Sequence, residues 1–309
     1  MPLHQTSGRW RLGLALSLTC TFVWGILPIA LAVTLQELDI YTVTWFRFFM
    51  AFGLLAAYLA ARKEFPNLQK LRSASLGLLA IATIFLGLNY LFFLQGLVLT
   101  SPTISEVVIQ LAPVLMSLGG LAIFKERYTL HQWGGLGVLA LGFALFVHGQ
   151  LEIVVTAQAT FLLGNICLVL GAITWAIYAL AQKQLLQKLP SSAIMLVIYG
   201  GCALLFSPLA KPQPLLSLSP LHLGMLLFCG LNTLIAYGAF AEALDHWEAS
   251  RVSAVIALTP IVTFVSMWAV SLLTPTLIAP ENVTPLGLWG AVLVVAGSMV
   301  IALAKKQHD

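Results

Sequence analysis

Three charged side chains lie inside apolar stretches that are long enough to cross a membrane: Arg47, Glu106 and Glu242. A charge at the centre of a bilayer is costly unless it is paired or solvated, so each of the three is a candidate functional residue. Arg47 and Glu106 lie at similar depths from the same side of the membrane, which allows an ion pair between them. A structural bridge, or a side chain that reaches back to the interface, is the alternative for Arg47.

Glu106 belongs to a polar stripe in the otherwise apolar segment 103–124. Thr103, Glu106, Gln110 and Pro113 are spaced so that a helix places them on one face. Contact with lipid would leave the carboxylate and the amide without partners, so the stripe predicts that Glu106 and Gln110 face a cavity. Pro113 predicts a kink, which serves either as a hinge or only as an aid to packing.

A second group of ionisable residues lies near one end of a predicted span. Asp245 separates Glu242 from His246, and two carboxylates beside an imidazole are able to exchange protons. The alternative is a solvated helix end close to Arg251. No residues in the sequence have the spacing of a metal site, of a nucleophile with its base or of a phosphate-binding loop. We therefore expect no metal, no cofactor and no catalytic residue.

Aromatic and amide side chains within the spans are further candidates for the wall of a cavity: Trp24, Asn89, Tyr90, Trp175, Tyr178, Asn232 and Tyr237. Tryptophan and tyrosine more often anchor a span at the interface or pack against neighbours. Trp24 and Trp175, however, lie too deep in their spans for an interfacial position, and the amides need hydrogen-bond partners inside the membrane. We predict that these residues line a cavity together with Glu106 and Gln110.

The elements that position these residues follow from composition. Apolar residues make up 60% of the 309 residues and charged residues only 8%, which excludes a soluble domain. Apolar runs long enough for a hydrocarbon core of about 30 Å recur along the chain. We predict an all-α integral membrane protein with ten transmembrane helices, at residues 12–34, 42–61, 74–97, 102–124, 131–149, 159–181, 192–210, 221–243, 250–273 and 285–304.

The distribution of basic residues predicts the orientation in the membrane. Thirteen of the fifteen Lys and Arg residues fall on the side of the N-terminus, with Lys211 on the other side and Arg47 within a span. Basic loops stay in the cytoplasm, so we expect both termini to be cytoplasmic in a protein of the plasma (inner) membrane. Because the basic residues flank the spans, the net charge of +4 does not indicate a nucleic-acid partner.

The second half of the chain repeats the first. A shift of 147 residues aligns residues 76–124 with 223–271 at eleven identical positions of forty-nine, a proline among them. Each half holds five spans, an odd number, so the two halves must cross the membrane in opposite directions. We therefore predict two inverted five-helix repeats, at 12–149 and 159–304. This arrangement is typical of secondary transporters, whose binding site lies at the interface of the repeats.

Several motifs are shared with one family of membrane proteins. They are Trp24-Gly25, Arg47 within TWFRFFMA, the runs APVLMSLGGLAIFKER and AEALDHWEASRVSAVIALTPIV, and the pair Gly290 and Gly297. With these motifs the chain resembles the EamA branch of the drug/metabolite transporter (DMT) superfamily over nearly its whole length. The resemblance implies ten helices in two inverted bundles around a central cavity, and it is not specific for a substrate. Two positions depart from the expected pattern, because Ala257 stands where the first half has Gln110 and Glu106 stands where a small residue is expected.

The resemblance implies a secondary transporter that works by alternating access. Small polar or amphipathic metabolites are the expected substrates, with amino acids among the candidates and export as the preferred direction. Within this interpretation the candidates for coupling or gating are Arg47, Pro113, Glu242, His246 and Pro260. The alternatives are an intramembrane enzyme that uses one of the glutamates with His246 and a membrane protein that only binds partners. The lipid bilayer and a small molecule are the expected partners, and the oligomeric state is left open.

Overall fold

The computed structural model describes residues 7, 9–66, 75–124, 129–151, 158–247, 249–274, 277–278 and 283–303, and within these ranges it contains helices and no strand. Five helices are long and apolar enough to cross a membrane: α1 (Trp10–Thr34), α2 (Ile40–Arg62), α4 (Leu76–Leu99), α8 (Gln158–Leu185) and α10 (Pro220–His246). The shorter helices are α5 (Pro102–Val108), α6 (Leu111–Phe124), α7 (Leu130–Leu151), α9 (Ser191–Phe206), α11 (Ala249–Ile256), α12 (Thr259–Leu273), α13 (Pro285–Leu303) and the 3₁₀ helix η1 (Gln213–Ser217).

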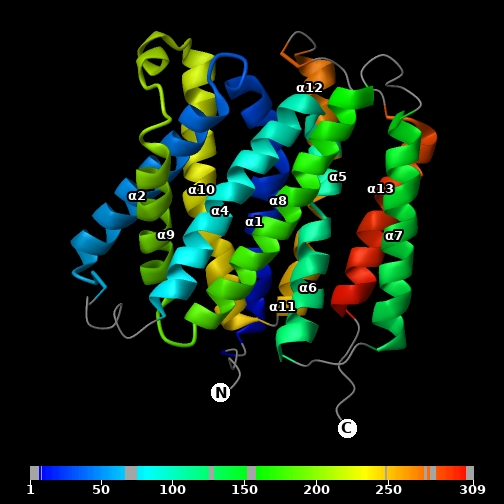
Figure 1. The fold of residues 1–309 in the computed structure, drawn as a ribbon, viewed down its shortest axis with the longest axis horizontal. Helices are drawn as coiled ribbons and strands as arrows, with labels where there is room; N and C mark the ends of the chain where they lie inside the picture. The colour runs from blue at the N-terminus through cyan, green and yellow to red at the C-terminus, as the bar shows by residue number, and fades with distance from the viewer. Residues whose placement is uncertain are drawn as a thin grey trace.

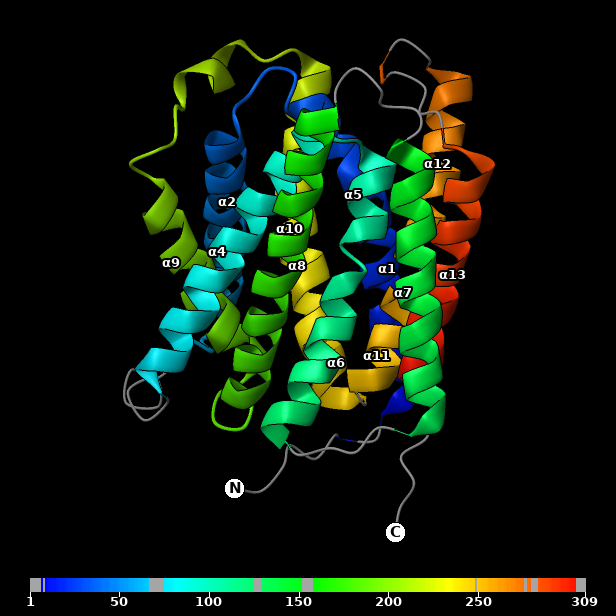
Figure 2. The same ribbon diagram turned by 45° about the vertical axis from the view of Figure 1, so that its right-hand side comes forward.

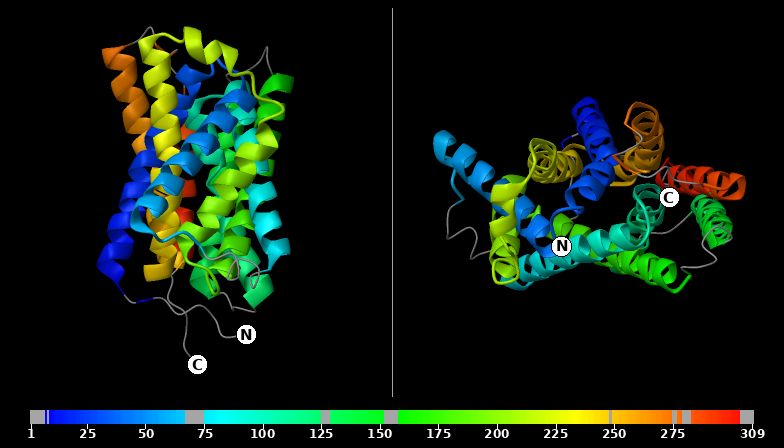
Figure 3. Two further views of the ribbon diagram at one scale, coloured as in Figure 1. Left: turned by 90° about the vertical axis from the view of Figure 1, so that its left-hand side faces the viewer. Right: turned by 90° about the horizontal axis from the view of Figure 1, so that it is seen from above.

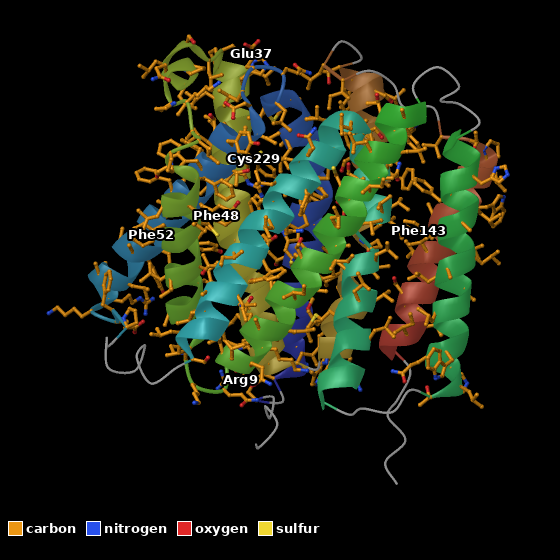
Figure 4. The ribbon with its side chains drawn as sticks, in the orientation of Figure 1. Arg9, Glu37, Phe48, Phe52, Phe143 and Cys229 are labelled. Atoms are coloured by element: carbon orange, nitrogen blue, oxygen red, sulfur yellow. The ribbon has the colours of Figure 1, made fainter. Side chains whose placement is uncertain are left out.

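The helices stand side by side in one bundle (Figure 1). α1 begins and α13 ends at the same end of this bundle, which we call the terminal face. Arg9 lies at the terminal face and Glu37 at the opposite end (Figure 4). The architecture agrees with the predicted all-α membrane class. The number of ten spans and their arrangement in inverted repeats stay predictions.

Serine and aspartate side chains begin four of the helices. The first backbone N–H groups of a helix have no partner within it, so an oxygen acceptor at the preceding residue stabilises the start. At the start of α2, Asp39 accepts from two backbone N–H groups at 2.9 and 3.0 Å. The hydroxyls of Ser75, Ser101 and Ser219 each accept from one backbone N–H group at the starts of α4, α5 and α10. These caps determine where the helices start and thereby which residues reach the middle of the bundle.

Two of the predicted spans, 102–124 and 250–273, are each divided into two helices. α5 ends at Val108 and α6 begins at Leu111, while α11 ends at Ile256 and α12 begins at Thr259. The kinks expected at the aligned prolines are therefore breaks in the helices.

Proline chemistry explains the position of both breaks. A proline ring clashes with the carbonyl four residues earlier and offers it no N–H. The carbonyls in question belong to Ile109 and Ile256. Each accepts from another donor, the backbone N–H of Ala112 at 2.8 Å in the first break and the hydroxyl of Thr259 in the second. Both carbonyls therefore keep a hydrogen-bond donor although the helix is interrupted at each break.

Three pairs of helices pack along much of their length: α1 with α10, α4 with α8, and α7 with α13. Figure 2 shows the last two pairs side by side. Glycines allow the closest approach, since a Cβ added to Gly297 on α13 would lie 2.7 Å from the carbonyl oxygen of Gly135 on α7. Seen end on, α7 and α13 form one edge of the bundle and α2 lies at the opposite edge (Figure 3). The two broken spans lie between these edges.

Candidate functional site

A cavity of about 80 Å³ lies inside the bundle, where both breaks meet residues of α1, α2, α4, α8 and α10. The first break contributes Ile109 and Gln110, and the second is represented by Ile256 and Thr259 on either side of the turn. The complete lining is Trp24, Leu27, Arg47, Asn89, Tyr90, Phe93, Leu94, Glu106, Ile109, Gln110, Ala112, Trp175, Tyr237, Ile256 and Thr259. The cavity therefore draws on both halves of the chain.

Most of the side chains singled out in the sequence lie on the cavity wall. The structure brings together Trp24, Asn89, Tyr90, Glu106, Gln110, Trp175 and Tyr237, and it adds Arg47 from α2. Tyr178 and Asn232 lie behind the wall: both are buried, but neither lines the cavity. Whether the lining residues bind a substrate stays a prediction.

Two asparagines fix the helices that surround the cavity. Asn89 on α4 donates through Nδ2 to the carbonyl of Gly171 on α8 at 3.0 Å, and Asn232 on α10 donates to the carbonyl of Val23 on α1 at 2.6 Å. An amide inside a membrane needs such a partner, and a backbone carbonyl of a neighbouring helix supplies it. Asn232, predicted to line the cavity, thus acts as a clamp between two helices.

Arg47 is held by α10 and not by Glu106. Its Nε donates to Thr233 Oγ1 at 3.0 Å and to the carbonyl of Cys229 at 3.3 Å, and its guanidinium lies 4.3 Å from the centre of the Tyr90 ring. The residue is only 2% exposed, so it does not reach back to the membrane interface. Although both residues are described, no ion pair joins Arg47 to Glu106. The ion pair that the sequence allowed is therefore not formed.

Thr233 completes this arrangement, and sequence reasoning missed it. Its hydroxyl accepts from Arg47 and, at 3.2 Å, from the Tyr90 hydroxyl, and it donates to the carbonyl of Cys229 at 3.0 Å. One donor and two acceptor sites are all that a hydroxyl offers, so Thr233 is fully used. A threonine within an apolar span gives no sequence signal that separates it from other threonines.

Glu106 and Gln110 line the cavity with side chains that are almost completely buried. Glu106, on α5, is 5% exposed and Gln110, in the break that follows, is 2% exposed. Gln110 Oε1 is buried and has no hydrogen-bond partner within the described ranges. Glu106 likewise forms no hydrogen bond or ion pair with a described residue. The stripe predicted from the sequence thus supplies the cavity with acceptors that lack donors.

An aromatic layer borders the cavity on the side of the terminal face. The ring centre of Trp24 lies 6.3 Å from that of Trp175 and 5.2 Å from that of Tyr237, and Phe240 packs against Trp175 at 5.2 Å. Tyr178 supports the layer from behind, 6.0 Å from Tyr237. These rings are continuous with a buried apolar cluster that extends along α8 and α10 towards the terminal face. The wall therefore combines apolar faces with a few polar groups, as small-molecule sites commonly do.

Glu242 and His246 lie away from the cavity, near the end of α10 at the terminal face. His246 Nε2 is 3.3 Å from Glu242 Oε1, and its Nδ1 is 2.8 Å from the hydroxyl of Ser7. Ser191 at the start of α9 donates to the other carboxylate oxygen of Glu242 at 2.8 Å. The Glu242 side chain is 45% exposed, so this group is solvated and joins three segments of the chain.

Of the two prolines proposed as gating residues, the structure describes the side chain of only one. Pro260 is buried at the start of α12 and does not line the cavity. The side chain of Pro113 lies outside the described residues.

Comparison with known proteins adds the family. The profile of the EamA-like transporter family matches residues 11–148 and again residues 162–303. The chain belongs to the EamA-like transporter family. The resemblance drawn from the motifs is thereby confirmed.

Curated relatives carry names that agree with this assignment. One from Escherichia coli K12, named as the uncharacterized inner membrane transporter YhbE, is 39% identical over 296 residues, which are 96% of this chain and 92% of that protein. One from Haemophilus influenzae Rd, named as an uncharacterized transporter, is 36% identical over 295 residues, 96% of each chain. A solved crystal structure shares the fold with a TM-score of 0.66 at 16% identity, covering 93% of this chain and 94% of its own. The EamA protein described here is thus a multi-pass membrane transporter.

Proposed function

We propose that this EamA protein is a secondary transporter that exports small polar or amphipathic metabolites, amino acids among them, by alternating access across the plasma membrane. The observation that carries the proposal is the cavity between the two broken spans. It buries Glu106, Gln110 and Arg47 inside a bundle of apolar helices. Polar groups buried within a membrane protein are energetically costly, and binding of a transported solute explains why they are present.

Two inverted repeats, at 12–149 and 159–304, are the proposed basis of the mechanism. If each helix of the first repeat has a counterpart in the second, α1 corresponds to α8 and α4 to α10. The contact of α1 with α10 then corresponds to the contact of α8 with α4, and both are among the most extensive in the bundle. The double match of the family profile supports the same division.

The glycine contacts between α7 and α13 support the symmetry independently. Gly135 lies against Gly297, and Gly142 lies against Gly290. In this part of the repeat the shift is 155 residues, which pairs Gly135 with Gly290 and Gly142 with Gly297. Exchange of the two halves therefore converts one glycine contact into the other. A twofold axis in the membrane plane has this property, because it relates antiparallel helices through the same patch on each.

The proposed orientation has both termini, and therefore the terminal face, in the cytoplasm. The basic residues near that face support it, and α1 begins where α13 ends (Figure 1). In this orientation the aromatic layer separates the cavity from the cytoplasm. We expect alternation to open this layer while the two halves close on the other side, with the breaks as the places where the broken spans bend. The substrate's own gradient, exchange or protons supply the driving force.

Flux through the purified protein in proteoliposomes tests the proposal. Vesicles loaded with a radiolabelled mixture of amino acids should release label faster than protein-free vesicles, and addition of the exported compound outside should accelerate exchange. An intramembrane enzyme would convert its compound without moving it, and a partner protein would do neither. Flux equal to that of protein-free vesicles for amino acids, amines and other small metabolites would exclude the transporter.

A further inference from the structure

Two polar side chains of the cavity wall lack hydrogen-bond donors among the described residues. Glu106 and Gln110 are four residues apart and both line the cavity, and neither the Glu106 carboxylate nor Gln110 Oε1 has a donor from any described residue. Buried acceptors without donors are costly, and a buried carboxylate without a countercharge is more costly still. A group that enters the cavity with several N–H donors and a positive charge would satisfy both side chains at once.

The cation already in the cavity does not fill this role. Arg47 is committed to Thr233 and to the backbone of α10 through Nε, and its guanidinium is stacked over Tyr90. The described lining contains no lysine, no histidine and no second arginine. An ionised Glu106 therefore has no countercharge in the described lining, and a cationic solute would supply one.

We infer that the cavity selects solutes with a primary ammonium group, which donates to the Glu106 carboxylate and to Gln110 Oε1 together. A primary ammonium carries three N–H donors on a compact charge, which suits two acceptors on the same cavity wall. A quaternary ammonium has the charge without N–H donors, and an alcohol has a donor without the charge. The inference rests on the proposed function, because it names the substrate class of the same cavity.

The remaining lining suits an apolar body on the same solute. Trp24, Trp175 and Tyr237 present aromatic faces and edges next to the acceptors. Amino acids and simple aromatic amines both combine a primary ammonium with such a body. They differ in the carboxylate, for which Arg47 in the same wall is the complementary charge.

A matched set of probes tests the inference on the unmodified full-length protein in detergent. Phenethylamine, phenethyltrimethylammonium and phenethyl alcohol share one aromatic body and differ only at the head group, and phenylalanine adds the carboxylate. Isothermal titration calorimetry should give binding of phenethylamine that is roughly tenfold or more tighter than binding of the quaternary and alcohol analogues. Phenylalanine should bind at least as well as phenethylamine if the solutes are amino acids and less well if they are simple amines.

Two variants locate the interaction, with a third as control. Glu106→Gln keeps the shape and removes the charge, and it should abolish the preference for the amine over the alcohol. Gln110→Leu removes the second acceptor and should bring the affinities of the primary and the quaternary cation together. Glu242→Gln changes a carboxylate outside the cavity and should leave all four affinities unchanged. Size-exclusion chromatography checks that each variant is folded.

Equal affinity of wild-type protein for phenethylamine and its quaternary analogue would overturn the inference, and this comparison needs no variant. An unchanged amine preference in folded Glu106→Gln would overturn it as well. A different result would contradict the proposed function. Selective amine binding without flux in proteoliposomes would support the amine site and contradict the proposal that the protein is a transporter. Flux of solutes that lack an amine, if unaffected by phenethylamine, would support the transporter and contradict the amine site.

Discussion

Gly142 on α7 and Gly290 on α13 touch backbone to backbone. A Cβ added to Gly290 would lie 2.7 Å from the carbonyl oxygen of Gly142, and one added to Gly142 would lie 2.8 Å from the carbonyl oxygen of Gly290. Helices in lipid associate through close packing of this kind, because lipid removes the hydrophobic driving force between them. The contact joins the last helix of each half of the chain.

Replacement of Gly142 by valine should destabilise the protein, because neither backbone can move aside. We expect a loss of about 1–3 kcal/mol, as for other overpacked sites, measured as a fall in the thermal unfolding temperature in detergent. Gly137→Val is the matched control, since it lies on the same helix and a Cβ there meets nothing within 4 Å. Equal effects of the two substitutions would show that the α7–α13 contact is not close.

Thr233→Val should disturb the site more than its size suggests. Valine has the same shape but leaves Arg47 Nε with one weak acceptor at 3.3 Å and removes one hydrogen-bond partner of the Tyr90 hydroxyl. An unsatisfied buried donor costs about 1–3 kcal/mol, so we expect a loss of that order in unfolding free energy. Thr19→Val is the control, because Thr19 is exposed and its hydroxyl bonds only to its own helix. Comparable losses in the two variants would contradict the role assigned to Thr233.

Much of the cavity was predictable from the sequence, because polar and charged groups are rare in membrane spans and each has to be explained. The stripe of Glu106 and Gln110 and the depth of Trp24 and Trp175 are such signals, and all four residues line the cavity. The prolines also indicated where the spans would deviate from a straight helix. They did not indicate that the deviation is a complete break, since that depends on whether Ile109 and Ile256 find other donors.

The rest of the site depends on contacts between helices, which a single sequence does not encode in its spacing. Phe93 and Leu94 line the cavity but cannot be told from the lipid-facing apolar residues of the same span. Arg47 and Glu106 have matching depths, yet Arg47 bonds to α10 because Thr233 and the carbonyl of Cys229 lie closer. Depth along a span is readable from the sequence, whereas the direction of a side chain around its helix axis depends on neighbours.

The proposed orientation is open to cysteine labelling in intact cells. All four native cysteines are buried, so they give little background. Glu37→Cys, exposed at the end opposite the terminal face, should react with an impermeant maleimide added outside. Arg62→Cys, exposed at the other end of α2, should react only after permeabilisation. Labelling of Arg62→Cys in intact cells would invert the proposed topology.

Amine binding should depend on pH through Glu106. The carboxylate must be ionised to hold an ammonium group, so protonation as the pH falls should weaken phenethylamine binding, by no more than about tenfold per pH unit for one proton. The other ionisable groups in the described lining are Arg47, Tyr90 and Tyr237, types that do not ordinarily titrate between about pH 5 and 8. A primary amine also stays protonated in this range, so the ligand contributes no slope of its own.

Calorimetric titrations at a series of pH values check this expectation. Glu106→Gln should bind phenethylamine weakly and with no pH dependence, because a glutamine amide does not titrate. Glu106→Asp, which restores a carboxylate on a shorter side chain, should recover the slope with a lower affinity. Glu242→Gln should reproduce the wild-type profile, because that carboxylate contacts Ser191 and His246 outside the cavity. If the slope survived in Glu106→Gln and vanished in Glu242→Gln, the proton would act at the terminal face and the assignment to the cavity would be wrong.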